Sequence, residues 1–218
     1  MVQYGQENAD QELGDSGTGG LRDAFTYLQE DMRSYCLGDE TNPRKESIDS
    51  AWILLGSMQH LTTNDDVIDC FQSTFNALRP GGTLIIELPH PRETFTMVEC
   101  TRNGWEVPLE DDEGTEYGEL KVIWGDDDDP FDPIRQVRDF TVALELTGVD
   151  ENDTDGEMKQ LQSVREVVPM RLFTAQEMDA LARCAGLRIV AMYGALSEEV
   201  DVDNDDEAFR LVCILRKE

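Results

Sequence analysis

Basic residues are scarce in this sequence. It holds 18 Lys and Arg against 47 Asp and Glu over 218 residues, which gives a formal net charge of -29. A surface of this sign repels nucleic acid and anionic membranes, because binding to either begins with Lys and Arg meeting phosphate. The sequence therefore predicts neither a nucleic-acid partner nor a membrane partner.

Long apolar runs and cysteine pairs are also lacking. No stretch of about 18 apolar residues could cross a bilayer, and the polar start MVQYGQENADQ has no apolar signal core. The five cysteines are widely spaced with no CxxC pair, which argues against a zinc site or a disulfide framework. From these absences we predict a soluble cytoplasmic protein without a metal.

Four runs hold 20 of the 47 acidic residues. The simplest interpretation is solvated loops, and adaptation to high salt is an alternative because lysine is so rare. A calcium loop is disfavoured, because no run has alternating oxygen ligands followed by glycine and a closing Glu. The runs are Glu110–Glu113, Asp126–Asp129, Asp150–Glu157 and Glu198–Glu207.

A strand, a helix and a second strand can be predicted in the first half. Residues 48–56 (IDSAWILLG) and 83–88 (TLIIEL) are short apolar runs, typical of strands buried on both faces of a parallel sheet. Between them, residues 63–79 have a helical apolar stripe, with Thr63 as N-cap and Pro80 and Gly81 after the end. This order predicts a βαβ unit.

Outside this unit the sequence pattern changes from alternating, strand-like residues to a helix and then to strands again. A strand is predicted at 24–30, and three more at 119–124, 134–146 and 164–172, the last three suggesting an antiparallel layer. A helix then begins at Thr174, where Glu177 completes a capping box, and strands at 187–193 and 208–215 close the chain.

Four blocks in this order resemble the class I S-adenosylmethionine-dependent methyltransferases. The resemblance implies a Rossmann-like α/β sheet with an antiparallel last strand. It also implies one domain, 1–218, with a partial cofactor-binding half (1–91), an antiparallel insertion (92–171) between the fifth strand and the last helix, and a C-terminal helix with the final hairpin (172–218). The blocks are DMRSY (31–35), IDSAWILLGSMQHL (48–61), ALRPGGTLIIELPHP (77–91) and LFTAQEMDALARCAGL (172–187).

The resemblance also assigns roles to particular residues. S-adenosyl-L-methionine is the implied cofactor, with Asp31 accepting a hydrogen bond from the adenine amino group and the backbone of Met32 contacting the ring. The methionine moiety would pass the loop Leu55, Gly56 and Ser57. Asp31 has a simpler interpretation as a turn cap.

The chain has only two histidines, His60 and His90, and both follow predicted strands. Either could accept a proton from a small-molecule methyl acceptor, although a structural role is the commoner one for such a histidine. Positioning alone can also drive methyl transfer, so a dedicated base is not required.

The resemblance calls for a glycine-rich loop after a first strand and an acidic residue after a second. The segment 12–21 (ELGDSGTGGL) is a poor match, because no apolar strand precedes it and Asp31 follows too soon. MVQYGQENA instead resembles the second helix, so we expect the first strand, first helix and second strand to be absent and cofactor binding to be impaired.

Other functions stay open at this point. One alternative is a catalytically inactive methyltransferase-like chain that supports a partner subunit. A Rossmann dehydrogenase is a weaker alternative, because its glycine-rich fingerprint would also lie in the missing region. An acidic protein that solvates a basic partner is weaker as well, because the four methyltransferase-like blocks occur in the family's order.

Overall fold

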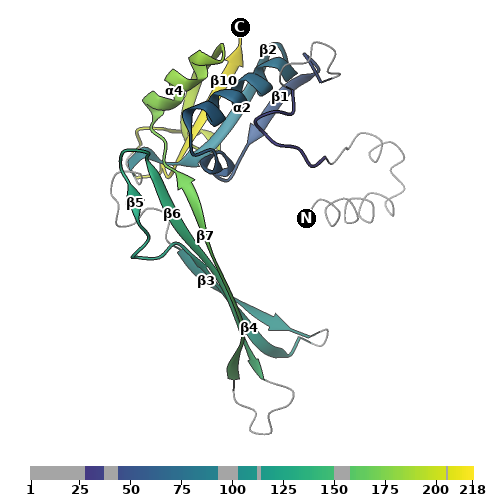
Figure 1. Cartoon of the computed structure of the whole chain (residues 1–218), viewed down its shortest axis with the longest axis vertical. Coiled ribbons are helices and arrows are strands. Elements are labelled where there is room, and N and C mark those ends of the chain that lie inside the picture. Colours follow the sequence, from purple (N-terminus) through teal and green to yellow (C-terminus); the bar gives the residue numbers. More distant parts are fainter. Residues whose placement is uncertain (1–27, 37–43, 93–102, 112–113, 150–157, 205) are drawn as a thin grey trace, which may run out of the picture.

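The computed structural model describes residues 28–36, 44–92, 103–111, 114–149, 158–204 and 206–218. They form two β-sheets and two longer helices, with sheet A carrying the helices and sheet B extending away from them (Figure 1). The segment MVQYGQENA, which resembles the second helix, and most of the predicted strand at 24–30 lie outside the described residues. Leu28, Gln29 and Glu30 have no regular secondary structure, so the strand does not extend over them.

Sheet A has the strand order β1-β2-β10-β8-β9. Strands β1 (Ile48–Ile53) and β2 (Leu78–Pro89) are parallel, with Trp52 opposite Ile85. Strand β10 (Arg210–Lys217) runs antiparallel to β2 and to β8 (Leu187–Ala195), and β9 (Ser197–Asp201) pairs with β8. The predicted βαβ unit and antiparallel last strand are therefore confirmed. In the described part of the chain β1 pairs only with β2, and it forms the edge of the sheet.

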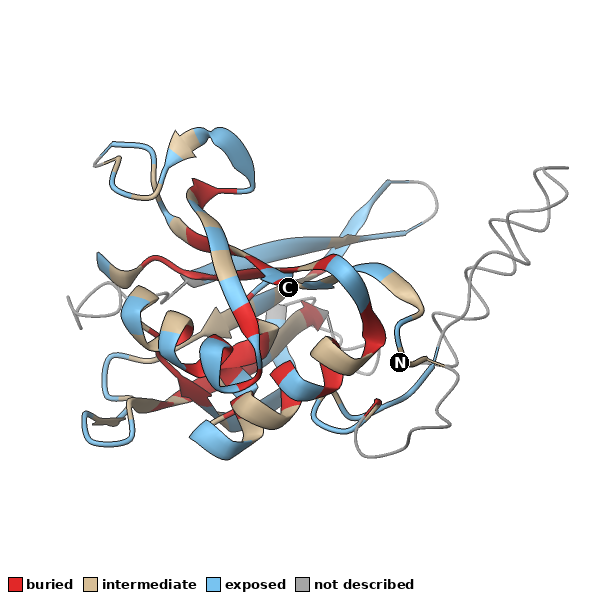
Figure 2. Cartoon of the chain, turned by 90° about the horizontal axis from the view of Figure 1, so that it is seen from above, coloured by how far each residue is buried: buried red, intermediate tan, exposed pale blue. Residues whose placement is uncertain are grey.

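Helices α2 (Asn64–Ala77) and α4 (Ala175–Cys184) form where the capping residues indicated. The hydroxyl of Thr63 accepts from the backbone N–H of Asp66, and that of Thr174 accepts from Glu177. Both helices contribute to one core with the inner face of sheet A, which Figure 2 shows as the main concentration of buried residues. The buried stripes include Val67 and Phe71 from α2 and Met178 and Leu181 from α4.

The predicted C-terminal end of α2 is wrong by two residues. The helix ends at Ala77, and Leu78 already has extended backbone and begins β2. Pro80 and Gly81 lie in the irregular stretch of β2 between the pairs Ile48–Leu78 and Ser50–Thr83. A proline fits there because it has no N–H to donate to the ladder.

Sheet B is the antiparallel layer that the sequence suggested, with larger strands than expected. Its path is β3-β4-β6-β5, and β7 pairs with β6. The strand predicted from residue 134 begins instead at Val137, because residues 133–136 make the turn between β5 and β6. The bounds are β3 (Asn103–Glu110), β4 (Glu116–Trp124), β5 (Phe131–Asp132), β6 (Val137–Val149) and β7 (Met158–Arg171).

Arg171 joins the two layers at the end of β7. Its side chain is 5% exposed, and its Nη2 donates to the carboxylate of Glu177 on α4 and to the side chain of Asn64 on α2. The guanidinium also lies over the ring of Phe173, 4.9 Å from the ring centroid. The side-chain amide of Gln59 donates to the Arg171 carbonyl at 3.3 Å. This one residue therefore fixes sheet B against both helices.

Candidate functional site

A strained turn follows β1 at the carboxyl end of the parallel pair. Leu55 and Gly56 both have left-handed backbone, with φ of 54° and 70°. Glycine suits this φ at Gly56, and a Cβ there would lie 2.6 Å from Oε1 of Gln59, so the Gln59 amide would have to shift. Ser57 closes the turn, since its hydroxyl donates to the Leu54 carbonyl at 2.8 Å. The 3-10 helix η2 (Ser57–His60) follows.

Glu87 of β2 holds this turn in place. Its Oε2 accepts from the Leu55 N–H at 2.9 Å, and its carbonyl accepts from the Gly56 N–H at 3.1 Å. The residue is 4% exposed and forms an ion pair with Arg210 of β10, with Nε to Oε1 at 3.2 Å. Sequence reasoning did not select Glu87. The available signal was a single carboxylate inside the apolar run TLIIEL, since Glu is almost never buried without a partner.

Asp31 is fixed by an arginine two residues away. It accepts from the backbone N–H of Arg33 at 2.9 Å and from Nη2 at 2.7 Å, while Nη1 of Arg33 reaches Asp66 at 2.7 Å. The side-chain hydrogen bonds from Arg33, and then its backbone hydrogen bond, lower the pKa of Asp31 to about 2. Because Asp66 lies in the first turn of α2, Asp31 sits on the side of the sheet where β1 ends. Met32 packs against the core of sheet A.

The two histidines have different surroundings. His90 is 6% exposed, with Nε2 2.7 Å from the Val202 carbonyl and Nδ1 accepting from the Arg92 N–H at 3.2 Å. Both ring nitrogens are thus engaged, which favours a structural role for His90. His60 is exposed at the end of η2, and its ring has no hydrogen-bond partner among the described residues. Of the two, His60 is the one that can receive a proton.

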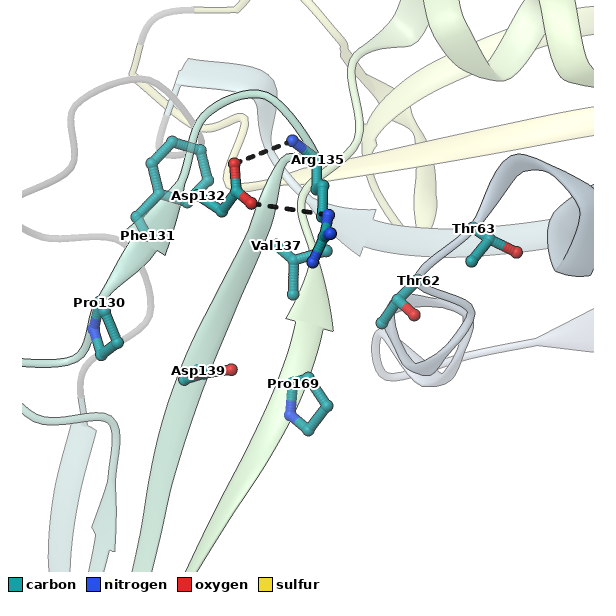
Figure 3. A pocket seen from close by; sticks show the side chains of 9 residues that line it. All are labelled: Thr62, Thr63, Pro130, Phe131, Asp132, Arg135, Val137, Asp139 and Pro169. Atoms are coloured by element: carbon teal, nitrogen blue, oxygen red, sulfur yellow. Dashed lines mark hydrogen bonds and ion pairs between the residues drawn. The ribbon is translucent and has the colours of Figure 1, made fainter.

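A pocket of about 640 Å³ opens between the loop before α2 and the β5–β6 hairpin (Figure 3). Asp132 is occupied there, since its Oδ1 accepts from the backbone N–H groups of Ile134 and Arg135. Within the described residues, the carboxylate of Asp139 has no hydrogen-bond or ion-pair partner. The pocket is lined by Thr62, Thr63, Pro130, Phe131, Asp132, Arg135, Val137, Asp139 and Pro169.

The pocket therefore combines apolar walls, the Thr62 hydroxyl and the Asp139 carboxylate, whereas the Thr63 hydroxyl is engaged with Asp66. Such a lining suits a hydroxylated small molecule that carries a positive charge. In the described ranges no group of three or more His, Cys, Asp and Glu side chains is arranged to hold a metal, and no helix is long and apolar enough to cross a membrane.

Comparison with known proteins finds a similar fold in solved methyltransferase structures. The chain is similar to the CcbJ methyltransferase from Streptomyces caelestis, at 18% identity and a TM-score of 0.59, over 100% of this chain and 75% of that one. A S-adenosylmethionine-dependent methyltransferase from Clostridium acetobutylicum gives 12% identity and a TM-score of 0.58, over 94% and 71%. CalS10, an amino pentose methyltransferase from Micromonospora echinaspora, gives 17% and 0.55, over 87% and 63%.

No protein-family profile and no curated protein matches the chain. At these identities the likeness concerns the fold. The fold is that of the S-adenosylmethionine-dependent methyltransferases, as the sequence blocks predicted.

Proposed function

We propose that this chain carries the acceptor side and part of the cofactor side of a methyltransferase site for a small molecule. The observation that carries the proposal is the Leu55–Gly56 turn, which follows the carboxyl end of β1 and leads along the chain to Thr62 and Thr63 of the pocket. In open α/β sheets ligands bind outside the carboxyl ends of the parallel strands, and this turn occupies that place.

On the cofactor side, Asp31 and Met32 would meet the adenine, and Leu55, Gly56 and Ser57 the methionine moiety. S-adenosyl-L-methionine supplies the transferable methyl group when bound. The described residues include no glycine-rich loop that could hold the rest of the cofactor. Because each hydrogen bond to a charged group contributes about 1.5–3 kcal/mol, two or three missing ones weaken binding by roughly two to six orders of magnitude.

On the acceptor side, the pocket selects a protonated amine on a hydroxylated scaffold. Asp139 would pair with the ammonium, and the hydroxyl of Thr62 would bind an acceptor hydroxyl. An amine must lose its proton before it attacks a methyl group, and the exposed ring of His60 is close in sequence to the threonines and able to take that proton. The amino pentose methyltransferase among the similar structures supports an acceptor of this class.

Cofactor titration tests the proposal. We expect calorimetry to detect weak, saturable binding of S-adenosyl-L-methionine to the chain, and Gly56→Ala to abolish it because the added Cβ displaces Gln59 and distorts the turn. Gly81→Ala is the matched control, since Gly81 also has positive φ but no atom within 4 Å of an added Cβ. No binding by the wild-type chain would favour the alternative function, an inactive methyltransferase-like chain that supports a partner subunit.

The acceptor assignment has a separate test. Asp139→Asn and His60→Gln should each lower the rate of methyl transfer from labelled cofactor to a panel of amino sugars. Glu145→Gln, on the same strand and the same face as Asp139 but outside the pocket, should leave the rate unchanged. Equal losses for Asp139→Asn and Glu145→Gln would refute the assignment.

A further inference from the structure

Leu55 has a backbone conformation that its own side chain does not explain. Its φ of 54° lies in the left-handed region, which is disfavoured for a leucine because the Cβ approaches a carbonyl oxygen. Packing does not impose this conformation, since the residue is 83% exposed. Gly56 also has a positive φ, so two left-handed residues follow each other. A disfavoured backbone persists only where other contacts hold it, and such positions gather at ligand sites.

The backbone N–H groups of both left-handed residues are bound by one residue, Glu87. Its carboxylate accepts from the Leu55 N–H at 2.9 Å, and its carbonyl accepts from the Gly56 N–H at 3.1 Å. The ladder between β1 and β2 has already ended, at the pair Ile53–Ile86. Among the described residues β1 is also the edge of sheet A, so no strand supports the turn from the other side. Glu87 therefore ties the turn to the sheet.

Arg210 holds the carboxylate of Glu87 in turn. Oε1 of Glu87 lies 3.2 Å from Nε of Arg210, whose guanidinium also lies over the ring of Phe209. Because Glu87 is 4% exposed, its charge needs such a partner. Both groups that meet the carboxylate, the Leu55 N–H and the guanidinium, are donors. A carboxylate, which only accepts and has two oxygens, can satisfy both at once.

We propose that Glu87 is a positioning residue for the cofactor, with Arg210 orienting its carboxylate. The inference rests on the proposed function, in which the methionine moiety of S-adenosyl-L-methionine meets the turn of Leu55 and Gly56. Glu87 acts through this turn and does not need to touch the cofactor. A turn that is already fixed loses little freedom when the ligand binds, so the hold raises the affinity. A turn without it would have to be ordered by the ligand.

Glu87→Gln tests the proposal, because it keeps the shape of the side chain and removes one acceptor. A glutamine presents one oxygen and one donating NH2 group to two donors, so either the Leu55 N–H or Arg210 loses its partner. Thr83→Val is the matched control. Thr83 lies on the same strand and the same face as Glu87, and its hydroxyl donates to Ser50 of β1 at 3.2 Å. The control thus removes a hydrogen bond between the same two strands but leaves the turn intact.

Two measurements on the full chain separate the turn from the cofactor. Amide hydrogen exchange followed by NMR reports on the turn without a ligand, and calorimetry with S-adenosyl-L-methionine reports the dissociation constant. For Glu87→Gln we expect both the exchange rate of the Leu55 amide and the dissociation constant to rise at least about tenfold, because a hydrogen bond to a charged group is weakened. The amides of the β2–β10 ladder should exchange as in the wild type. For Thr83→Val both quantities should stay within about twofold of the wild-type values.

Thermal melts check that the variants fold. Arg210→Met provides a second variant should Glu87→Gln fail to fold, since the side chain of Arg210 is 35% exposed, and it should move both quantities in the same direction. Wild-type exchange at Leu55 in Glu87→Gln overturns the proposal. Faster exchange with an unchanged dissociation constant overturns it too, because Glu87 would then have a structural role alone; in both cases binding by the wild-type chain leaves the proposed function standing. A wild-type chain that binds no cofactor refutes the proposed function and the positioning role together.

Discussion

Glu177→Gln should destabilise the protein strongly, because it leaves the guanidinium of Arg171 buried without its carboxylate. The side chain of Arg171 is 5% exposed and that of Glu177 18%, so water cannot replace the lost partner well. Nε and Nη1 of Arg171 already have no hydrogen-bond partner, and Asn64 would be left as the main acceptor. The substitution therefore removes the one carboxylate that compensates the buried charge of Arg171.

The size of the effect follows from the burial. Removing one partner of a buried ion pair costs about 3–5 kcal/mol. A glutamine can still accept one hydrogen bond and the site is slightly open, so we expect about 2–3 kcal/mol for Glu177→Gln. At about 2–4 °C for each kcal/mol in a chain of this size, the melting temperature should fall by about 5–10 °C.

A double-mutant cycle separates the pair from the packing. Arg171→Met removes the charge and keeps an apolar side chain over Phe173, and Glu177 can still bind the side-chain amide of Gln136, 3.2 Å away. The double variant should therefore be more stable than Glu177→Gln alone. Urea unfolding followed by circular dichroism gives the four free energies.

The same helix offers the control. Asp179 and Arg183 of α4 form an exposed i,i+4 pair, with side chains 35% and 59% exposed. Asp179→Asn should cost less than about 1 kcal/mol, as exposed pairs do. If Glu177→Gln costs no more than Asp179→Asn, or if the double variant is the least stable of the set, the reasoning about a buried charge is refuted.

Three further outcomes are expected. Gly56→Ala should lower the free energy of unfolding by about 1–2 kcal/mol, because an alanine is strained at positive φ and its Cβ would also clash with Gln59. Gly81→Ala should cost less, because it has the strain without that clash. Urea unfolding compares the two variants, and equal costs would contradict the argument from space. In the wild-type chain the contact between Asp31 and Arg33 is fully present above about pH 4 and is lost as the pH falls toward 2. Arg33→Met should raise the pKa of Asp31 from about 2 toward 3.8, so that Asp31 takes up its proton at a higher pH; carboxyl NMR titration measures this, and an unchanged pKa would exclude Arg33 as the cause of the low value. The melting temperature should rise between about 0.01 and 0.1 M salt, as screening shortens the repulsion among the acidic residues, and a flat or falling value would count against that view.

The sequence by itself determined the elements whose signals are local. Thr63 and Thr174 cap helices as predicted, because a cap needs only a side chain and an N–H three residues away. The apolar runs around Trp52 and Ile85 became the parallel pair, and the run around Ile85 is buried as predicted. The prediction that residues 48–56 are buried on both faces was wrong, because β1 lies at the edge of the sheet and Trp52 is 65% exposed. The methyltransferase-like order of elements was visible because these signals are local.

Tertiary structure decided whatever depends on distant partners. The end of α2 moved to Ala77 because Leu78 pairs with Ile48 across the sheet, which helix periodicity does not report. The engagement of His90 depends on the carbonyl of Val202, 112 residues away, and the burial of Glu87 on its pairing with Arg210. A residue's type shows what it can bind, but only the fold brings its partner within reach, because that distance is set by the packing of the whole chain.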